Sequence, residues 1–523
     1  MVIGQYARLG VLLEAGGCAI LTAMNTNRRD FLKGTAWMGA AAMAAGCISK
    51  GNALGFGEGG SMHGFRVAPM KVVHVGVIGV GNRGLPAVQR IAQIPGCVVT
   101  AISDINPTRL DLTQKWLSDH GYPKAKEWSR NGDEEAWKGL CDSDVCDVVY
   151  SVTPRPLHCP INVYAMDHGK HVLQEVPGAF SLEECWATVE AAERNRRHCM
   201  MLENCTYGEA EMLAFNLIHK GKLGEIVQAE VGYTHDQRSL QYKPTDGRFW
   251  RIDRHMKHHG NYYPTQGLVP AGRCLDINRG DRFEHLVSFE TKSASFEAFG
   301  RENFPADDRV TGVDGKTFNR HTQKMTKGDV NMCLMHTAMG KTLTLKHNVC
   351  TPCPYDRGNL YLGTMGIFKG IKFPEKAEDA YTMGSPCQFG WLDKTDARVE
   401  KFFDFKKAMQ IREEYKHPFW KVAGEMAQKV GGHGGMDFIM DLRWAYCLQN
   451  GLPLDTDVYD LATYSSIVEL SERSVNAGGK VIDFPDYTRG GWKTAKPFTV
   501  DEIDIKKFDF GNGVVHSKDA QAT

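Results

Sequence analysis

The hydrophobic residues follow two different patterns along the chain. In the first part they form short continuous runs: KVVHVGVIG from Lys71 to Gly79, then Val98–Ser103, Val145–Val152 and His171–Leu173. Runs of this kind are typical of strands that are buried on both faces of a parallel sheet. They predict an α/β domain over residues 70–205.

The pattern changes after Tyr207. A helical stretch from Glu209 to Lys220 ends at Gly221, and short strands then alternate with loops: Ile226–Tyr233, Leu286–Phe289, Thr342–His347 and Gly366–Phe368. We expect an α+β domain over residues 206–495 with an open, mainly antiparallel sheet, followed by a C-terminal tail over 496–523. Residues Thr234 to Leu275 are rich in His, Arg, Tyr and Gly, which predicts a long functional loop.

The beginning of the chain has the composition of a targeting segment. Arg28-Arg29 precede a short apolar run, as in a twin-arginine export signal, and that run is too short to span a bilayer. We expect residues 1–50 to hold this signal, which begins naturally at Met24, so that residues 1–23 come from a mis-called upstream start. Residues 51–69 are expected to form a glycine-rich linker. The predicted destination is the periplasm. Ala45-Gly46-Cys47 has the shape of a lipoprotein cleavage site, which leaves a lipid anchor at Cys47 open.

Composition narrows the class of ligand. The 62 Lys and Arg residues balance 62 Asp and Glu residues. Since nucleic-acid binding needs a basic excess or patch, this balance favours a small-molecule ligand. The 15 cysteines are odd in number and irregularly spaced, unlike a disulfide scaffold. Cys350 and Cys353 form a lone CxxC without a second pair of ligands, so we expect no metal site.

A glycine-rich motif follows the first predicted strand. Gly79, Gly81 and Gly84 form GxGxxG around Asn82 and Arg83, and a helical pattern follows at once. In that order, the glycines permit a tight turn and bring the pyrophosphate to a helix N-terminus. Asp104, at the end of the second strand, would accept hydrogen bonds from ribose hydroxyls and repel a 2′-phosphate. These residues predict a Rossmann domain that binds NAD.

Two further segments carry a family resemblance. Thr153-Pro154 lead to His158 in TPRPLH, and a later strand runs into Glu175-Val176-Pro177. They are similar to the ATP-x-x-x-H and EKP stretches of Gfo/Idh/MocA oxidoreductases, which implies cofactor contacts at Thr153, Pro154, His158 and Glu175. Dehydrogenases of that superfamily have a lysine where this chain has Val176. Valine neither donates a hydrogen bond nor carries charge, which argues against a plain alcohol dehydrogenase.

A sharper resemblance runs through residues 70 to 495. Long, unusual words carry it: ENCTYG (203–208), GNYYPTQGLVP (260–270), DINRGDR (276–282), PCPYDR (352–357) and VGGHGGMDFIMD (430–441). They resemble glycoside hydrolase family 109, the NAD-dependent α-N-acetylgalactosaminidases of the same superfamily. The resemblance implies oxidation of a sugar at C3, elimination at C1–C2, addition of water and return of the hydride, with no net redox change.

The resemblance also implies roles for particular residues. Tyr207 matches a proposed acid/base, while Arg251, Tyr263 and Tyr355 match residues that hold the substrate. Tyr263 is also a catalytic candidate. His433, between glycines in VGGHGGMD, is a candidate ligand-side histidine near the cofactor or the sugar, or else a turn histidine that precedes a helix.

One departure from the family pattern changes the chemistry. The family reads YPTHG where this chain has Gln266, and an amide cannot accept a proton near neutral pH. Gln266 therefore takes the place of a catalytic histidine but can only orient a hydroxyl. The candidate substitutes for that histidine are Tyr207, His255, His258 and His259.

Three functions remain open from the sequence. The first is a retaining glycosidase that uses bound NAD+ as a transient hydride carrier. The second is a sugar or cyclitol dehydrogenase with net NADH turnover, and the third is an inactive protein that binds sugar and NAD. Superfamily members often pair through the second-domain sheet, which implies a homodimer by analogy.

Overall fold

The computed structural model describes residues 60–129, 132–243, 249–312, 315–379, 384–392 and 398–499. The predicted export signal, Cys47, the start of the linker and residues 500–523 of the predicted tail lie outside these ranges.

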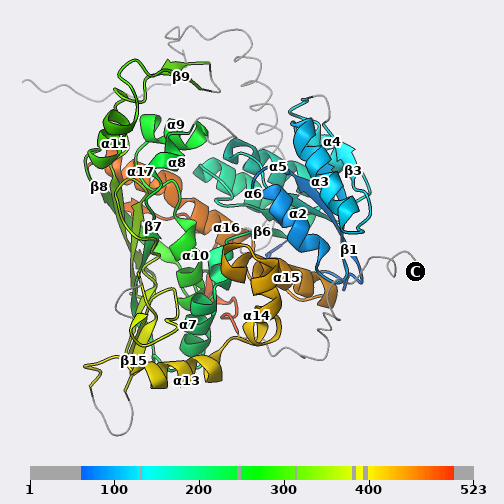
Figure 1. The fold of residues 1–523 in the computed structure, drawn as a ribbon. Helices are drawn as coiled ribbons and strands as arrows, with labels where there is room; N and C mark the ends of the chain where they lie inside the picture. Colours follow the sequence, from blue (N-terminus) through cyan, green and yellow to red (C-terminus); the bar gives the residue numbers. More distant parts are fainter. Residues whose placement is uncertain are drawn as a thin grey trace, which may run out of the picture. The chain divides into compact units, whose positions relative to one another are not determined.

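A sheet of six parallel strands forms the first half of this structure (Figure 1). Its order is β3-β2-β1-β4-β5-β6. The strands are β1 (Val73–Ile78), β2 (Cys97–Ser103), β3 (Lys126–Trp128), β4 (Val148–Ser151), β5 (His171–Gln174) and β6 (Cys199–Met201). The predicted parallel sheet is confirmed. The order reverses between β1 and β4, which is where sheets of this kind bind ligands at their carboxyl ends.

Helices cover both faces of the parallel sheet. They are α2 (Gly84–Ala92), α3 (Pro107–Asp119), α4 (Trp137–Asp142), α5 (His158–Asp167), α6 (Leu182–Asn195) and α15 (Met436–Asn450). The sequence pattern places α15 in the second domain, yet it packs on this sheet through a buried carboxylate. Asp441 accepts hydrogen bonds from Arg90 of α2 (2.7 Å) and from Tyr150 of β4 (3.1 Å).

The second sheet has eight strands in the order β15-β14-β13-β7-β12-β11-β8-β16. Strands β12 and β7 run parallel, and the other neighbours run antiparallel, as expected. The bounds are β7 (Ile226–Thr234), β8 (Phe283–Glu290), β11 (Val330–Thr337), β12 (Thr342–Asn348), β13 (Leu360–Gly363), β14 (Gly366–Lys369), β15 (Gln388–Trp391) and β16 (Ile482–Asp483).

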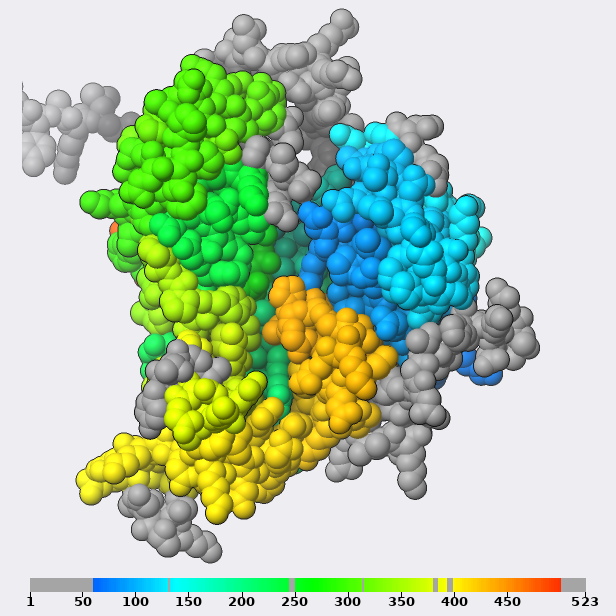
Figure 2. All heavy atoms as spheres, in the orientation of Figure 1, coloured from blue at the N-terminus to red at the C-terminus, as the bar shows by residue number. Residues whose placement is uncertain are grey.

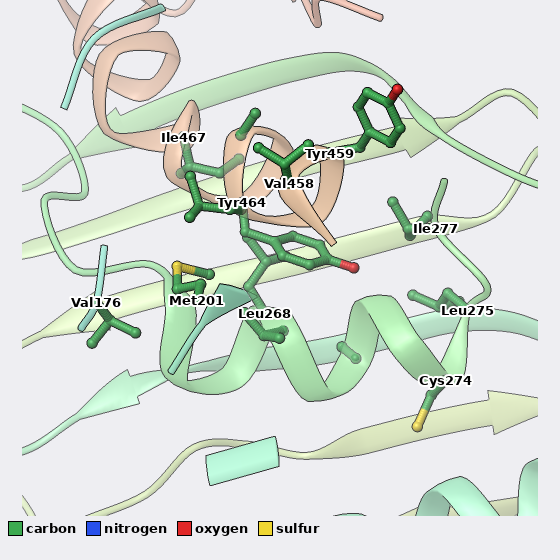
Figure 3. Close-up of a cluster of buried hydrophobic side chains, with 14 of the residues drawn as sticks. Val176, Met201, Leu268, Cys274, Leu275, Ile277, Val458, Tyr459, Tyr464 and Ile467 are labelled. Carbon is green, nitrogen blue, oxygen red and sulfur yellow. The ribbon is translucent and has the colours of Figure 1, made fainter. Parts of the chain in front are cut away.

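One face of the second sheet carries helices, and the other is open to solvent (Figure 1). Helix α10 (Thr265–Cys274) lies on β7, and α17 (Ile467–Asn476) lies on β8. Helices α7 (Glu209–His219) and α16 (Val458–Ser465) pack against α10. Figure 3 shows the buried cluster between α10 and α16, with Leu268 on the former and Tyr464 on the latter.

The predicted long loop from Thr234 to Leu275 is wrong, because this segment contains helices. They are α8 (Arg238–Gln241), α9 (Phe249–Lys257) and the buried α10. Its small residues allow close packing: a Cβ on Gly267 would lie 2.5 Å from the backbone nitrogen of Gly232, and one on Gly272 would lie 2.2 Å from the Tyr464 hydroxyl. Glycine and Pro270 weaken a helix pattern in isolation, but tertiary packing overrides that preference.

Shorter elements complete the described chain. They are α11 (Ser295–Asn303), α13 (Phe405–Tyr415), α14 (Pro418–Val430), β9 (Val310–Thr311), β10 (Thr317–Phe318) and the 3-10 turns η1 (Arg155–Leu157), η2 (Asn204–Tyr207), η3 (His433–Gly435) and η4 (Gly491–Lys493). No helix in the part of the chain described is long and apolar enough to cross a membrane.

Candidate active site

The glycine-rich loop joins β1 to α2, and its three glycines have different neighbours. A Cβ on Gly79 would lie 2.7 Å from the carbonyl oxygen of Val152, and one on Gly84 would lie 1.8 Å from that of Gly79. A Cβ on Gly81 would meet no heavy atom within 4 Å. Gly79 and Gly84 are therefore required for packing, whereas Gly81 leaves space in front of the α2 N-terminus. That space fits a pyrophosphate, since free N–H groups at a helix N-terminus favour anions.

Asp104 and Asn82 stabilise this loop. The Asp104 carboxylate, just beyond β2, accepts the Val80 N–H at 2.8 Å and the Asn106 N–H at 2.8 Å. The Asn82 side chain accepts a hydrogen bond from Arg109 at 3.0 Å. Asp104 thus lies at the end of β2 beside the loop, where the sequence predicts it, and its contact with ribose stays a prediction.

Arg83 links the loop to the rest of the cavity. Its Nε donates to Glu175 at 2.7 Å, and its Nη1 donates to the buried carboxylate of Asp437 at 2.6 Å. Asp437 also accepts from Asn204 at 2.5 Å, and His433 Nδ1 lies 2.9 Å away. Burial alone would raise the pKa of Asp437, but the hydrogen bond to His433 and the charges of Arg83 and Arg90 hold it below its ordinary value.

His433 lies on the cofactor side of the site. Its side chain is 62% exposed beside Arg83 and the N-terminus of α15, and its backbone has φ +48°. The flanking Gly432 also has positive φ, and a Cβ there would lie 2.7 Å from the Cβ of Asp437. The glycines therefore allow this turn to lie close against α15.

His158 is buried and does not line the cavity, so its predicted contact with the cofactor stays a prediction. Its ring is buried, with Nδ1 2.7 Å from the carbonyl oxygen of Pro177 and Nε2 3.0 Å from that of Thr153. Burial lowers its pKa to about 4. Both nitrogens face backbone carbonyls, so His158 braces Thr153-Pro154 against the Val176-Pro177 turn. Thr153 itself adjoins the glycine loop, since a Cβ on Gly79 would lie 3.2 Å from its nitrogen.

A cavity of about 1210 Å³ opens between the two sheets. Arg83, Glu175, Val176 and His433 line it on the side of the glycine-rich loop, and residues 207–494 provide most of the opposite wall. That wall includes Arg251, Tyr263, Gln266, Tyr355, Tyr233, His235 and Gln237. In Figure 2, the orange surface of the C-terminal helices lies between the blue surface of the parallel-sheet domain and the green and yellow surface of the second domain.

Tyr263 lies among arginines. The guanidinium of Arg155 is 4.4 Å from the centre of its ring, and that of Arg251 is 5.9 Å away. Arg155 is buried, stacks on Trp250 at 3.8 Å and donates to the Tyr262 carbonyl. Burial, aided by Arg251, lowers the pKa of Arg155 to about 9. The positive charges oppose the rise that burial causes in the pKa of Tyr263.

Tyr355 is held in the cavity wall by a buried ion pair. Arg357 donates to the Tyr355 hydroxyl at 2.8 Å and pairs with the carboxylate of Glu211. The Sγ of Cys205 lies 3.9 Å from the same hydroxyl. Burial and the thiol of Cys205 raise the pKa of Tyr355 well above its ordinary value. Tyr355 therefore enters the site as a neutral phenol.

Gln266 faces the cavity from the first turn of α10. Its Oε1 is buried and has no hydrogen-bond partner among the described residues. A buried amide oxygen without a partner costs stability, so Gln266 is poised to accept a hydrogen bond from a bound ligand.

Tyr207 does not line the cavity, so its predicted catalytic role stays a prediction with no cavity contact to support it. Its side chain is 1% exposed, and its hydroxyl donates to Asp455 at 3.1 Å. Burial raises the pKa of Tyr207 well above its ordinary value. The η2 turn directs the neighbouring side chains of Asn204 and Cys205 to the cavity instead.

The three histidines considered as substitutes for the missing family histidine also lie elsewhere. His255 is buried beside the hydroxyl of Tyr262, His258 pairs with Glu472, and His259 pairs with Glu290. None of them lines the cavity. The structure instead brings His235 into the cavity, one residue beyond β7. The sequence alone did not identify His235 as a candidate.

Tyr207→Phe provides a first prediction. We expect the free energy of unfolding to fall by about 1 kcal/mol, because the Asp455 hydrogen bond is lost while Arg443 still pairs with that carboxylate. Turnover should stay within about threefold of the parent protein. Urea unfolding and steady-state rates measure the two effects. A loss of turnover above tenfold with an unchanged fold would support the catalytic role of Tyr207.

Two protein families match this chain, one over the part that holds the parallel sheet and the other over the part that holds the second sheet. Residues 73–203 match the oxidoreductase family with an NAD-binding Rossmann fold. Residues 207–494 match the C-terminal domain of glycosyl hydrolase 109. The first domain is therefore an NAD-binding Rossmann domain, and its glycine loop fits that cofactor.

Individual relatives agree with both matches. A glycosyl hydrolase family 109 protein of Shewanella pealeana is 37% identical over 91% of this chain and 99% of its own length. One of Porphyromonas gingivalis is 40% identical over 82% of this chain and 87% of its own length.

Solved structures show the same fold at low identity. Levoglucosan dehydrogenase in complex with NADH and levoglucosan aligns with a TM-score of 0.57 at 18% identity, over 79% of this chain and 100% of that chain. Apo scyllo-inositol dehydrogenase of Lactobacillus casei aligns with a TM-score of 0.53 at 13% identity, over 80% of this chain and 99% of that chain. The chain is thus an enzyme of the Gfo/Idh/MocA type and belongs to glycosyl hydrolase family 109.

Proposed function

We propose that this enzyme is a glycosidase that uses NAD+ as a transient hydride carrier, on α-N-acetylgalactosaminides or related glycans. One observation supports this most: a single cavity joins the glycine-rich loop, through Arg83 and Glu175, to a wall of sugar-binding character at Arg251, Tyr263 and Gln266. Aromatic rings and planar polar groups suit a sugar, which presents both C–H faces and hydroxyls.

The chemistry divides between cofactor and protein. Bound NAD+ supplies reversible hydride removal at C3 of the sugar. A ketone at C3 acidifies the C2 proton, so an ordinary protein base can remove it and the C1 substituent can leave. Arg251 and the neutral Tyr355 are placed to hold sugar oxygens, and Gln266 accepts a hydrogen bond from a hydroxyl. Tyr263, beside the charges of Arg155 and Arg251, is suited to stabilise developing negative charge on the sugar.

Val176 stands where the superfamily's dehydrogenases have a lysine. Its side chain lines the cavity beside Glu175, where it provides neither a proton nor a charge to a sugar hydroxyl. The proposed glycosidase and a dehydrogenase both oxidise a hydroxyl, so in either enzyme another residue must supply that function. We treat net oxidation as the outcome that would replace our proposal.

The test is a panel of aryl α- and β-glycosides in D2O, offered to purified protein starting after Cys47 with NAD+ supplied. We expect release of the aglycone and one deuterium at C2 of the product. Accumulation of free NADH without aglycone would establish the dehydrogenase. If neither aglycone nor NADH forms with any sugar that binds, the protein is a binding protein.

We also propose export through the twin-arginine route to the periplasm. The support is the Arg28-Arg29 pair and the short apolar run after it. Replacing both arginines with lysine should retain the protein in the cytoplasm on cell fractionation. Labelling with a fatty acid would test whether Cys47 carries a lipid.

Pairing through the open face of the second sheet is a further proposal. Phe289, Met332 and Leu334 are exposed there on adjacent strands, with Met332 opposite Phe289. Exposed apolar side chains on a sheet face are typical of a protein interface. We expect a dimer by light scattering, and Leu334→Asp should shift it toward monomer while the far-ultraviolet circular dichroism is unchanged. A monomeric parent protein would contradict this proposal.

A further inference from the structure

Oxidation of a hydroxyl requires a proton acceptor in the cavity, and Gln266 cannot serve. As the carbon loses its hydride, the oxygen must lose its proton to a group that is unprotonated near neutral pH. An amide has no such state. The inference below rests on the proposed oxidation step and identifies the group that takes the proton.

Several ionisable groups of the cavity are already engaged. Glu175 pairs with Arg83, Glu209 with Arg412 and Glu211 with Arg357. Protonation of any of these carboxylates would break its ion pair and leave the partner arginine without its counter-charge. His433 Nδ1 faces Asp437 and Arg83 on the far side, at the glycine-rich loop.

The end of β7 carries a different arrangement. Gln237 Nε2 donates to the Tyr233 hydroxyl at 2.7 Å, and that hydroxyl lies 3.1 Å from His235 Nδ1. Since the phenol oxygen accepts from Gln237, its own proton is free to point at Nδ1. Gln237 Nε2 also lies 3.1 Å from Nδ1, which again makes Nδ1 the acceptor. This pattern assigns the neutral His235 ring with its proton on Nε2 and its lone pair on Nδ1.

The same residues lie beside the expected sugar. Tyr233, His235 and Gln237 line the cavity, and the Tyr233 ring packs 5.1 Å from that of Tyr263. Gln266 is also close to this strand, because the Cβ position of its neighbour Gly267 lies 2.5 Å from the nitrogen of Gly232. A hydroxyl held by Gln266 is therefore near the end of β7.

We propose that Tyr233 and His235 form a proton relay that replaces the single base missing at Gln266. The O–H bond of the sugar breaks and its proton passes to the Tyr233 oxygen, while the Tyr233 proton passes to His235 Nδ1. The C–H bond breaks with its electron pair, which leaves as hydride to NAD+. The products are a ketone, NADH and an imidazolium at His235. The return of the hydride reverses each transfer.

The surroundings of the relay suit both partners. Burial lowers the pKa of His235, with Arg251 adding to the effect and Asp236 opposing it, so the ring is neutral at pH 7. Asp236 itself is paired with Arg238. The rings of Tyr355 and His235 pack in a T-shaped arrangement, with their centroids 5.0 Å apart. Burial raises the pKa of Tyr233 and so disfavours a free phenolate. The Tyr233 oxygen must therefore take the sugar proton in the same step in which it gives its own proton to His235.

The test compares Tyr233→Phe, His235→Asn and the control His74→Gln, an exposed histidine outside the cavity. The readouts are single-turnover formation of bound NADH and its pH profile. In the parent protein the rate should rise as pH increases through the pKa of His235, below 6.5. His235→Asn should lower the maximal rate of bound-NADH formation about 100-fold or more and abolish its rise with pH. Tyr233→Phe should lower the maximal rate to a similar extent. His74→Gln should change neither.

A second readout needs no turnover. Nitrogen-15 spectra of the holoenzyme should show His235 protonated on Nε2. The pKa of His235 should rise in Tyr233→Phe, because the hydrogen bond from the Tyr233 hydroxyl to Nδ1 favours the neutral ring. A neutral ring protonated on Nδ1 would overturn the relay. A His235→Asn variant that keeps both the parent rate and its rise with pH would also overturn the relay. If the parent protein binds sugar but forms no bound NADH, the proposed oxidation itself fails, and that outcome is distinct from failure of the relay alone.

Discussion

Replacing Gly81 with valine should weaken NAD binding by at least about 100-fold while the apoprotein keeps its melting temperature. The fold tolerates a side chain here, because a Cβ at Gly81 would meet no atom within 4 Å. The same space lies in front of the α2 N-terminus, where a pyrophosphate must approach the backbone. A 100-fold loss corresponds to about 2.7 kcal/mol of binding free energy. Quenching of tryptophan fluorescence by NAD+ measures it.

Gly84→Ala is the matched comparison within the same motif. Its Cβ would lie 1.8 Å from the carbonyl oxygen of Gly79, so the backbone of the loop must shift. We expect this variant to lower the melting temperature of the apoprotein, unlike Gly81→Val. If Gly81→Val binds NAD+ as tightly as the parent protein, the phosphates do not lie over this loop.

Asp437→Asn should lower the free energy of unfolding by about 3–5 kcal/mol at pH 7. The carboxylate is 1% exposed and joins Arg83, Asn204 and His433, with Arg90 at 3.7 Å. Removing one partner of a buried charge network leaves the other charges uncompensated. Urea unfolding measures the loss. NAD affinity should fall as well, because Arg83 belongs to the glycine-rich loop.

The effect of Asp437 should depend on pH in a defined direction. Its pKa in the folded protein is held below the ordinary 3.8, so its stabilising effect is complete above pH 3.8 and is lost as pH falls further. The gap between Asp437→Asn and the parent protein should therefore narrow in acid. Asp119→Asn, which breaks an exposed pair with Lys115, is the control and should cost less than about 0.5 kcal/mol. A gap that widens in acid would contradict the assigned charge state.

Local patterns were sufficient to predict the NAD-binding Rossmann domain and its glycine-rich loop. Gly79, Gly81 and Gly84 act within one strand–turn–helix unit, and Asp104 follows the adjacent strand, so short spacing determines their positions. The strand before His235 was also predictable, because apolar residues alternate along β7. These inferences needed no knowledge of distant contacts.

The remaining parts of the site could not be predicted from local patterns, because they depend on contacts between residues far apart in the sequence. Asp437 contacts the glycine-rich loop although it lies more than 350 positions further along the chain. By sequence, α15 belongs to the second domain, but its carboxylates Asp437 and Asp441 bind Arg83 and Arg90 of the first. The resemblance gave Tyr207 a proposed acid/base role but could not show that its hydroxyl donates to Asp455. A titratable residue directly after a strand, in a segment already marked as functional, was the signal that could have identified His235.

We propose that the hydride leaves the sugar and returns to it within one hydrolytic cycle. An aryl α-N-acetylgalactosaminide with deuterium at C3, supplied with NAD+ in amounts below the substrate, tests this claim most directly. We predict a slowed first oxidation, complete release of the aglycone and a product that retains deuterium at C3. Deuterium found in free NADH, with turnover that stops once NAD+ is exhausted, would contradict the claim and make the enzyme a dehydrogenase.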